Sequence, residues 1–156
     1  MVELNETEQK EYDGYMVVLQ DETTSVDIRI DVLIKLSHFF IGKDFSESFK
    51  YASLATIITD IPRADACCCL GDMYLIANKI KWAKIWYRHA LDDSYREGCD
   101  CKYWTYLPLV KFAQIDFMEG QYDSALNLVE ALLIMRKDDV DILELKEVIL
   151  SKIDKK

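Results

Sequence analysis

Apolar residues recur along most of the chain at intervals of three and four, which places them on one face of an α-helix. Residues 26–40 show this most clearly, because Ile28, Val32, Leu36 and Phe39 form one broad stripe. Short polar breaks separate this segment from similar ones. The pattern predicts seven helices, over residues 26–40, 45–58, 62–77, 80–91, 106–118, 122–135 and 140–153.

The residues at the breaks fit these boundaries. Pro62 is expected at the start of a helix and Pro108 in the first turn of another, where proline costs no hydrogen bond. The polar stretch 92–102 reads as a loop, and Asp138 or Asp139 as the cap of the last helix. Joints of two to four residues predict antiparallel helical hairpins. The hairpins could form either a bundle or a stack of repeats.

Internal similarity favours the stack. Ser48, Ala83 and Ala125 hold equivalent places in the second helices of three hairpins, at intervals of 35 and 42 residues. The first interval is close to the period of about 34 residues of a tetratricopeptide repeat (TPR), and the loop 92–102 can hold the excess of the second. The residues that match this pattern and are expected to pack the repeats together are Leu70, Gly71, Tyr74, Ala83, Tyr87, Ala90, Gly120, Tyr122 and Ala125.

The chain therefore resembles a TPR domain. This implies an all-α fold in which three TPR-like hairpins stack as a right-handed superhelix that ends in a C-terminal capping helix; the alternative is a generic helical bundle. The expected organisation is an acidic leader or linker over 1–25 and a TPR domain over 26–156, with repeats at about 26–59, 62–94 and 105–137 and the capping helix at about 139–154.

A narrower resemblance involves a Cys-Cys-x-Leu-Gly segment ending at Gly71, the Trp86-Tyr87 pair, a long loop and Leu107-Pro108. In that order these features are similar to the TPR region that follows the catalytic domain in some bacterial family 2 glycosyltransferases. The resemblance spans about residues 26–149 and implies an accessory, non-catalytic region. The sugar-nucleotide-binding domain of that family is not in this sequence.

Charge is distributed unevenly. The 156 residues carry a net charge of −9, and residues 1–25 hold seven acids against Lys10 alone. Because phosphate binding needs clustered cations, nucleic acid is not an expected partner. The apolar run Tyr15–Leu19 inside the leader has two possible interpretations. It either docks on the first repeat or helps to join a preceding domain.

The sequence contains neither a run long enough to span a membrane nor an export signal, so we expect a cytoplasmic protein whose five cysteines are reduced. Consecutive residues of a helix point about 100° apart, so Cys67, Cys68 and Cys69 cannot share one metal. The alternative is a metal or redox site built from the loop pair Cys99 and Cys101 together with one cysteine of the helix, and no cofactor is expected.

Three further features have plain structural interpretations. The Asp139-Val140-Asp141 triplet could hold a nucleotide-bound cation, but at a helix start it is interpreted as a cap. His38 and His89 have no nucleophilic partner in a recognisable motif, which indicates structural roles. The aromatic residues around Trp82 and Trp104 are interpreted as packing rather than as a sugar-stacking surface.

The first helices of TPR hairpins line a concave groove, which is the expected binding surface for a protein or peptide. The predicted groove residues are mostly apolar and include no cation, which disfavours a clamp for a peptide carboxylate and favours an apolar or basic segment. They are Ile30, Leu33, Ser37, Phe40, Asp65, Cys68, Asp72, Leu75, Leu107, Val110, Gln114 and Phe117.

The sequence thus predicts an interaction or oligomerisation module rather than an enzyme. The expected context is an attached glycosyltransferase domain, where the module would support dimerisation or hold an acceptor protein. The alternative is a freestanding cytosolic adaptor that binds a peptide or protein.

Overall fold

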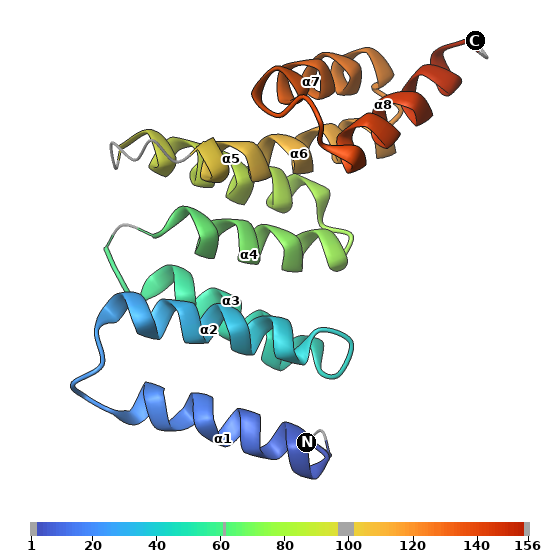
Figure 1. Ribbon diagram of the computed structural model, residues 1–156. Helices are drawn as coiled ribbons and strands as arrows, with labels where there is room; N and C mark the ends of the chain where they lie inside the picture. Colours follow the sequence, from blue (N-terminus) through green and yellow to red (C-terminus); the bar gives the residue numbers. More distant parts are fainter. Residues whose placement is uncertain (1–2, 61, 97–101, 155–156) are drawn as a thin grey trace.

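The computed structural model describes residues 3–60, 62–96 and 102–154, and these residues form eight α-helices (Figure 1). Seven of the helices correspond to the predicted ones, with the largest differences at the end of α5 and the start of α6, and α1 is additional. The helices are α1 (Glu6–Gln20), α2 (Val26–Phe40), α3 (Phe45–Ile57), α4 (Ala64–Ile76), α5 (Ile80–Arg96), α6 (Lys102–Met118), α7 (Tyr122–Met135) and α8 (Val140–Ile153).

Consecutive helices pack against one another along the whole chain, which gives the layered arrangement of Figure 1. The most extensive contacts lie within three pairs, α2 with α3, α4 with α5 and α6 with α7. The first helices of these pairs also touch, α2 against α4 and α4 against α6. The fold therefore sets α2, α4 and α6 side by side in one row.

The turns inside the three pairs use residues that tolerate a left-handed backbone. Gly42, Asn78 and Gly120 have φ values of 78°, 56° and 75°. Gly120 is exposed, and a Cβ added to it would have no neighbour within 4 Å. The prediction that Gly120 packs between repeats is therefore wrong, since it serves to end α6.

Gly71 has the opposite role, because α4 and α5 cross closely at this position. A Cβ on Gly71 would lie 2.7 Å from Cε1 of Tyr87, so glycine leaves the space that the Tyr87 ring occupies against α4. Tyr87 is fully buried, and its hydroxyl donates a hydrogen bond of 2.5 Å to Asp72 Oδ1. Ala83 and Ala90, one turn to either side, are also fully buried. These residues hold the second hairpin together.

The other packing positions lie beside this contact or in the third hairpin. Leu70 and Ala125 are buried. Tyr74 and Tyr122 are half-buried, and the Tyr122 ring lies 5.6 Å from that of Phe117.

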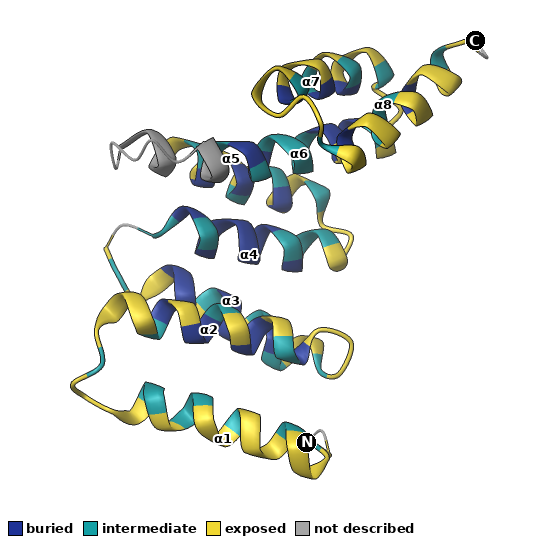
Figure 2. Cartoon of the chain, in the orientation of Figure 1, coloured by how far each residue is buried: buried dark blue, intermediate teal, exposed yellow. Residues whose placement is uncertain are grey.

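The acidic leader is a helix rather than a linker. Asn5 accepts a hydrogen bond from the Glu8 amide while the Glu8 carboxylate accepts one from the Asn5 amide, which is a capping box. Tyr12, Tyr15, Val18 and Leu19 of α1 pack against the apolar cluster centred on α2. No residue of α1 is itself buried, which Figure 2 shows as yellow and teal along its length. The run Tyr15–Leu19 thus docks on the first hairpin.

The predicted loop 92–102 is shorter than expected. Helix α5 continues to Arg96 and α6 begins at Lys102, so Pro108 lies inside α6 and not in its first turn. Pro108 is buried there. It has no N–H to donate back to the carbonyl of residue 104.

Within the described residues, no helix has both the length and the apolar content needed to cross a bilayer. The buried side chains form clusters between neighbouring helices, and Figure 2 shows the corresponding stripes on α2 and α4.

Candidate functional site

The predicted groove residues of the first hairpin do not share one groove, since Phe40 lines a pocket with Tyr12 of α1 and Leu33 lines a separate one with Leu19 of α1. Ile30, Leu33, Ser37 and Phe40 are all buried. Helix α1 covers this face of α2, where the ring of Tyr12 meets the ring of Phe40 edge-on at 5.9 Å. This part of the groove prediction is wrong, because the sequence reading left α1 out of the stack.

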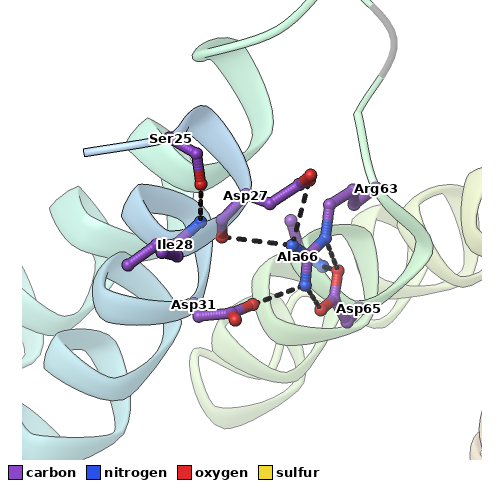
Figure 3. Close-up of polar contacts among 7 residues, drawn as sticks. All are labelled: Ser25, Asp27, Ile28, Asp31, Arg63, Asp65 and Ala66. Carbon is purple, nitrogen blue, oxygen red and sulfur yellow. Dashed lines mark hydrogen bonds and ion pairs between the residues drawn. The ribbon is translucent and has the colours of Figure 1, made fainter. Parts of the chain in front are cut away.

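Between α2 and α4, ion pairs close the surface (Figure 3). Arg63, the N-cap residue of α4, reaches Asp31 Oδ1 at 2.6 Å and Asp27 Oδ1 at 3.4 Å on α2. It also pairs with Asp65, one of the predicted groove residues, on α4 itself. These hydrogen bonds raise the pKa of the Arg63 guanidinium, so it stays charged. Asp65 is thus engaged within the fold.

Between α4 and α6, the remaining predicted residues of the second hairpin are also engaged. Asp72 accepts the hydrogen bond from Tyr87 and pairs with Lys111 of α6 at 2.9 Å. Cys68 is buried, and burial raises the pKa of its thiol. Leu75 is half-buried against the cluster of α4 and α5. Cys68 therefore cannot line an exposed groove.

In the third hairpin, three of the four predicted residues line one groove together. Leu107, Val110 and Gln114 of α6 form one wall of an open groove of about 500 Å³. The fourth predicted residue, Phe117, is half-buried and packs in the cluster of α6, α7 and α8. This groove thus lies at the C-terminal end of the row of first helices.

The opposite wall of the groove comes from α8 and the residues before it. The lining residues on this side are Arg136, Asp139, Asp141, Ile142, Glu144, Leu145 and Val148. Sequence reasoning missed them as groove residues, because α8 was interpreted only as a capping helix.

A signal for them was present in the sequence. An interval of 34 residues, which is the TPR period, separates Leu107 from Asp141, Val110 from Glu144 and Gln114 from Val148. Helix α8 therefore presents the groove positions of a further first helix.

At one end of the groove, Asp139 joins α6 to α8. The Tyr106 hydroxyl donates a hydrogen bond of 2.6 Å to Asp139 Oδ2, and the amide of Ile142 donates one of 3.3 Å to Oδ1. The Tyr106 contact is the main cause of the lowered pKa of Asp139, and burial is the main cause that raises the pKa of Tyr106 to about 12. The guanidinium of Arg136 lies 4.3 Å from the centre of the Tyr106 ring. Asp139 caps α8 as predicted.

The other two acids of the groove differ from Asp139. Asp141 and Glu144 are exposed on α8, and within the part of the chain that the structure describes neither has an ion-pair partner. Leu107, Val110, Leu145 and Val148 give the walls between them an apolar character. The groove therefore offers apolar contact beside negative charge.

The thiols and histidines do not form a second site in the described residues. Cys67, Cys68 and Cys69 are buried in α4, and burial raises the pKa of Cys69 to about 11, so its neutral thiol is a poor nucleophile. His38 Nε2 lies 4.0 Å from Cys69 Sγ, and His89 lies against Trp86. No group of three His, Cys, Asp or Glu among those residues gathers as a metal site would. Cys99 and Cys101 lie outside the described residues.

Comparison with known proteins identifies the fold. No protein-family model and no curated protein matches the chain. Among solved structures, the chain is similar to the crystal structure of MamA, with 13% sequence identity and a TM-score of 0.60 over 99% of this chain and 98% of that one. MamA is a TPR-like all-helical protein, so the likeness shows that this chain has a helical-repeat fold of the TPR type.

Proposed function

We propose that the chain is a non-catalytic protein-interaction module and that the groove between α6 and α8 holds a segment of its partner. The observation that carries this proposal is that three predicted groove positions of α6, Leu107, Val110 and Gln114, line one open groove together, whereas the four predicted positions of α2 are buried. A TPR-like fold is an interaction scaffold in general, and apolar walls with a few polar groups are typical of a peptide-binding groove.

The repeat architecture in this proposal follows the contacts between helices. The pairs α2/α3, α4/α5 and α6/α7 are the three repeat units, stacked as a right-handed superhelix, and α8 caps the last unit while supplying the second wall of the groove. Helix α1 covers the other end.

The expected context is the accessory region of a bacterial glycosyltransferase in the cytoplasm. Support for it is the order of Leu70-Gly71, Trp86-Tyr87 and Leu107-Pro108 in the sequence. The coding sequence upstream of Met1 tests it: a nucleotide-sugar domain in the same frame supports an attached enzyme, and a stop codon directly before Met1 leaves the freestanding adaptor. Dimerisation is tested separately by sedimentation of the purified chain.

Selection of peptides from a random phage-displayed library tests the binding role. The selected peptides are expected to bind the native chain and to lose at least tenfold in affinity for Val148→Asp, because this change puts a charge into the apolar wall. The matched control is Leu150→Asp on the same helix, which also replaces an exposed apolar residue but lies outside the groove. Equal losses for both variants, or no enriched peptide, would contradict the proposal.

A further inference from the structure

We infer that the segment held between α6 and α8 is basic and amphipathic, with Lys or Arg side chains beside the apolar residues that enter the groove. This inference rests on the proposed function and adds the chemistry of the partner to it.

The first step concerns the charge of the groove. Its lining contains the acids Asp139, Asp141 and Glu144 and the single cation Arg136. Asp139 is held by Tyr106 and by the first turn of α8, whereas Asp141 and Glu144 project from α8 at an interval of three residues. Residues three apart on a helix lie on the same face. The groove thus presents two neighbouring carboxylates with an apolar wall next to them.

The second step concerns the cations of the fold that face the other helices of the row. Arg63 is bound to Asp27, Asp31 and Asp65, and Lys111 is bound to Asp72. On α8 itself, Lys146 pairs with Glu130 of α7 at 3.1 Å and so faces away from α6. In the described residues, the junctions α2/α4 and α4/α6 therefore pair their acids internally, whereas at α6/α8 Arg136 lies near Asp139 and no ion pair reaches Asp141 or Glu144.

The third step concerns what can neutralise Asp141 and Glu144. A cation from outside would gain the attraction of both carboxylates, while an acidic segment would be repelled by them and by the net charge of −9 of the chain. The same net charge opposes a second copy of this chain as the occupant. A basic amphipathic helix fits both the apolar wall and the acids, because its cations recur every three or four residues, as the two acids do.

Two synthetic helical peptides test this inference. They share one stripe of Leu residues and differ in their flanking residues, which are Lys in the first and Glu in the second. Fluorescence anisotropy with the full chain is expected to show at least tenfold tighter binding of the Lys peptide. The preference should shrink as salt is raised from about 0.05 to about 0.5 M, because the ion pairs lie at an exposed rim.

Protein variants locate the effect. The double variant Asp141→Asn/Glu144→Gln is expected to weaken binding of the Lys peptide about threefold to tenfold and to leave the Glu peptide unchanged or better bound. The matched control is Asp123→Asn/Glu147→Gln, which likewise removes one acid from the first turn of a helix and one from an exposed mid-helix position, but outside the groove. Circular dichroism shows whether each variant keeps the helical fold.

The outcomes separate the inference from the proposed function. Equal binding of both peptides, lost in Val148→Asp, would leave the groove as a binding site and overturn its preference for basic segments. Binding of neither peptide would overturn both. A third outcome would show that the occupant is a second copy of this chain. In that case the native chain would sediment as an oligomer, Asp141→Asn/Glu144→Gln would sediment as a smaller species, and the Lys peptide would not dissociate the oligomer. The inference would then be wrong.

Discussion

The junctions α2/α4 and α6/α8 join helices of the same row, yet one is closed and the other is open. At α2/α4 the N-cap residue is Arg63, and it gathers Asp27, Asp31 and Asp65 around one guanidinium (Figure 3). At α6/α8 the N-cap residue is Asp139.

Asp139 satisfies the first turn of its own helix and the Tyr106 hydroxyl. The acid two residues after the cap is Asp65 in the first case and Asp141 in the second. A cation at the cap thus binds the acids of its junction to one another, while an acid at the cap leaves Asp141 and Glu144 facing the groove. The identity of one capping residue separates a structural junction from a candidate binding surface.

The largest effect is expected from removing the cation of the closed junction. Arg63→Ala leaves the mostly buried carboxylate of Asp65 without its partner and should lower the free energy of unfolding by about 2 kcal/mol. No capping bond is lost, since the Arg63 side chain makes none. Urea unfolding followed by circular dichroism measures the change. Lys10→Ala, which removes a highly exposed ion pair with Glu6, serves as the control and should cost less than about 0.5 kcal/mol. If both variants lost the same free energy of unfolding, the Arg63 junction would not be a special source of stability.

A smaller effect is expected at the cap of the open junction. Asp139→Ala removes the acceptor for the Ile142 amide and for the Tyr106 hydroxyl, and should cost about 1 to 2 kcal/mol in the same unfolding measurement. Asp139→Asn keeps a capping oxygen and should cost less than about 0.5 kcal/mol. If the two variants were equally unstable, the charge of Asp139 and not its hydrogen bonds would hold the junction.

The smallest effect concerns pH. Tyr106→Phe removes the main cause of the lowered pKa of Asp139, so that pKa should rise toward the ordinary value of 3.8. A carboxyl group whose pKa is lowered by folding stabilises the fold above its unfolded pKa and loses this contribution as pH falls through the folded pKa. The stability difference between the native chain and the variant should therefore shrink below about pH 4.

Carboxyl NMR titration checks this expectation directly. Tyr15→Phe, whose hydroxyl contacts Glu11 on α1, is the control and should leave the pKa of Asp139 unchanged. An unchanged pKa in Tyr106→Phe would contradict the assigned cause.

Local signals explain which parts of the fold were predictable. The apolar stripes of α2, α7 and α8 gave their bounds to within a residue, since periodicity and caps are read directly from neighbouring residues. Helix α1 was missed although Asn5 and Glu8 have the spacing of a capping box, because the acids of the leader, four of them in the helix itself, obscured its narrow stripe. The bounds of α6 were misplaced because Pro108 suggested a first turn, whereas the buried surroundings of Pro108 stabilise it inside the helix.

The candidate site was only partly predictable for a different reason. Leu107, Val110 and Gln114 were expected to face a groove and do so, but Ile30 and Phe40 hold the equivalent kind of position and are buried. Whether a helix face is exposed depends on which other segment packs on it. The spacing of residues within the helix does not predict where that other segment docks.

The sequence by itself determined seven of the eight described helices, the repeat period and the need for a small residue at Gly71, because each follows from short-range spacing or from the size of one side chain. Only the tertiary structure decided where the row of first helices is closed and where it is open. That outcome depends on α1 covering α2, on Arg63 and Lys111 reaching acids of neighbouring helices, and on α8 lying opposite α6. These are contacts between residues far apart in the chain, whose energies depend on distance in space and not on separation in sequence.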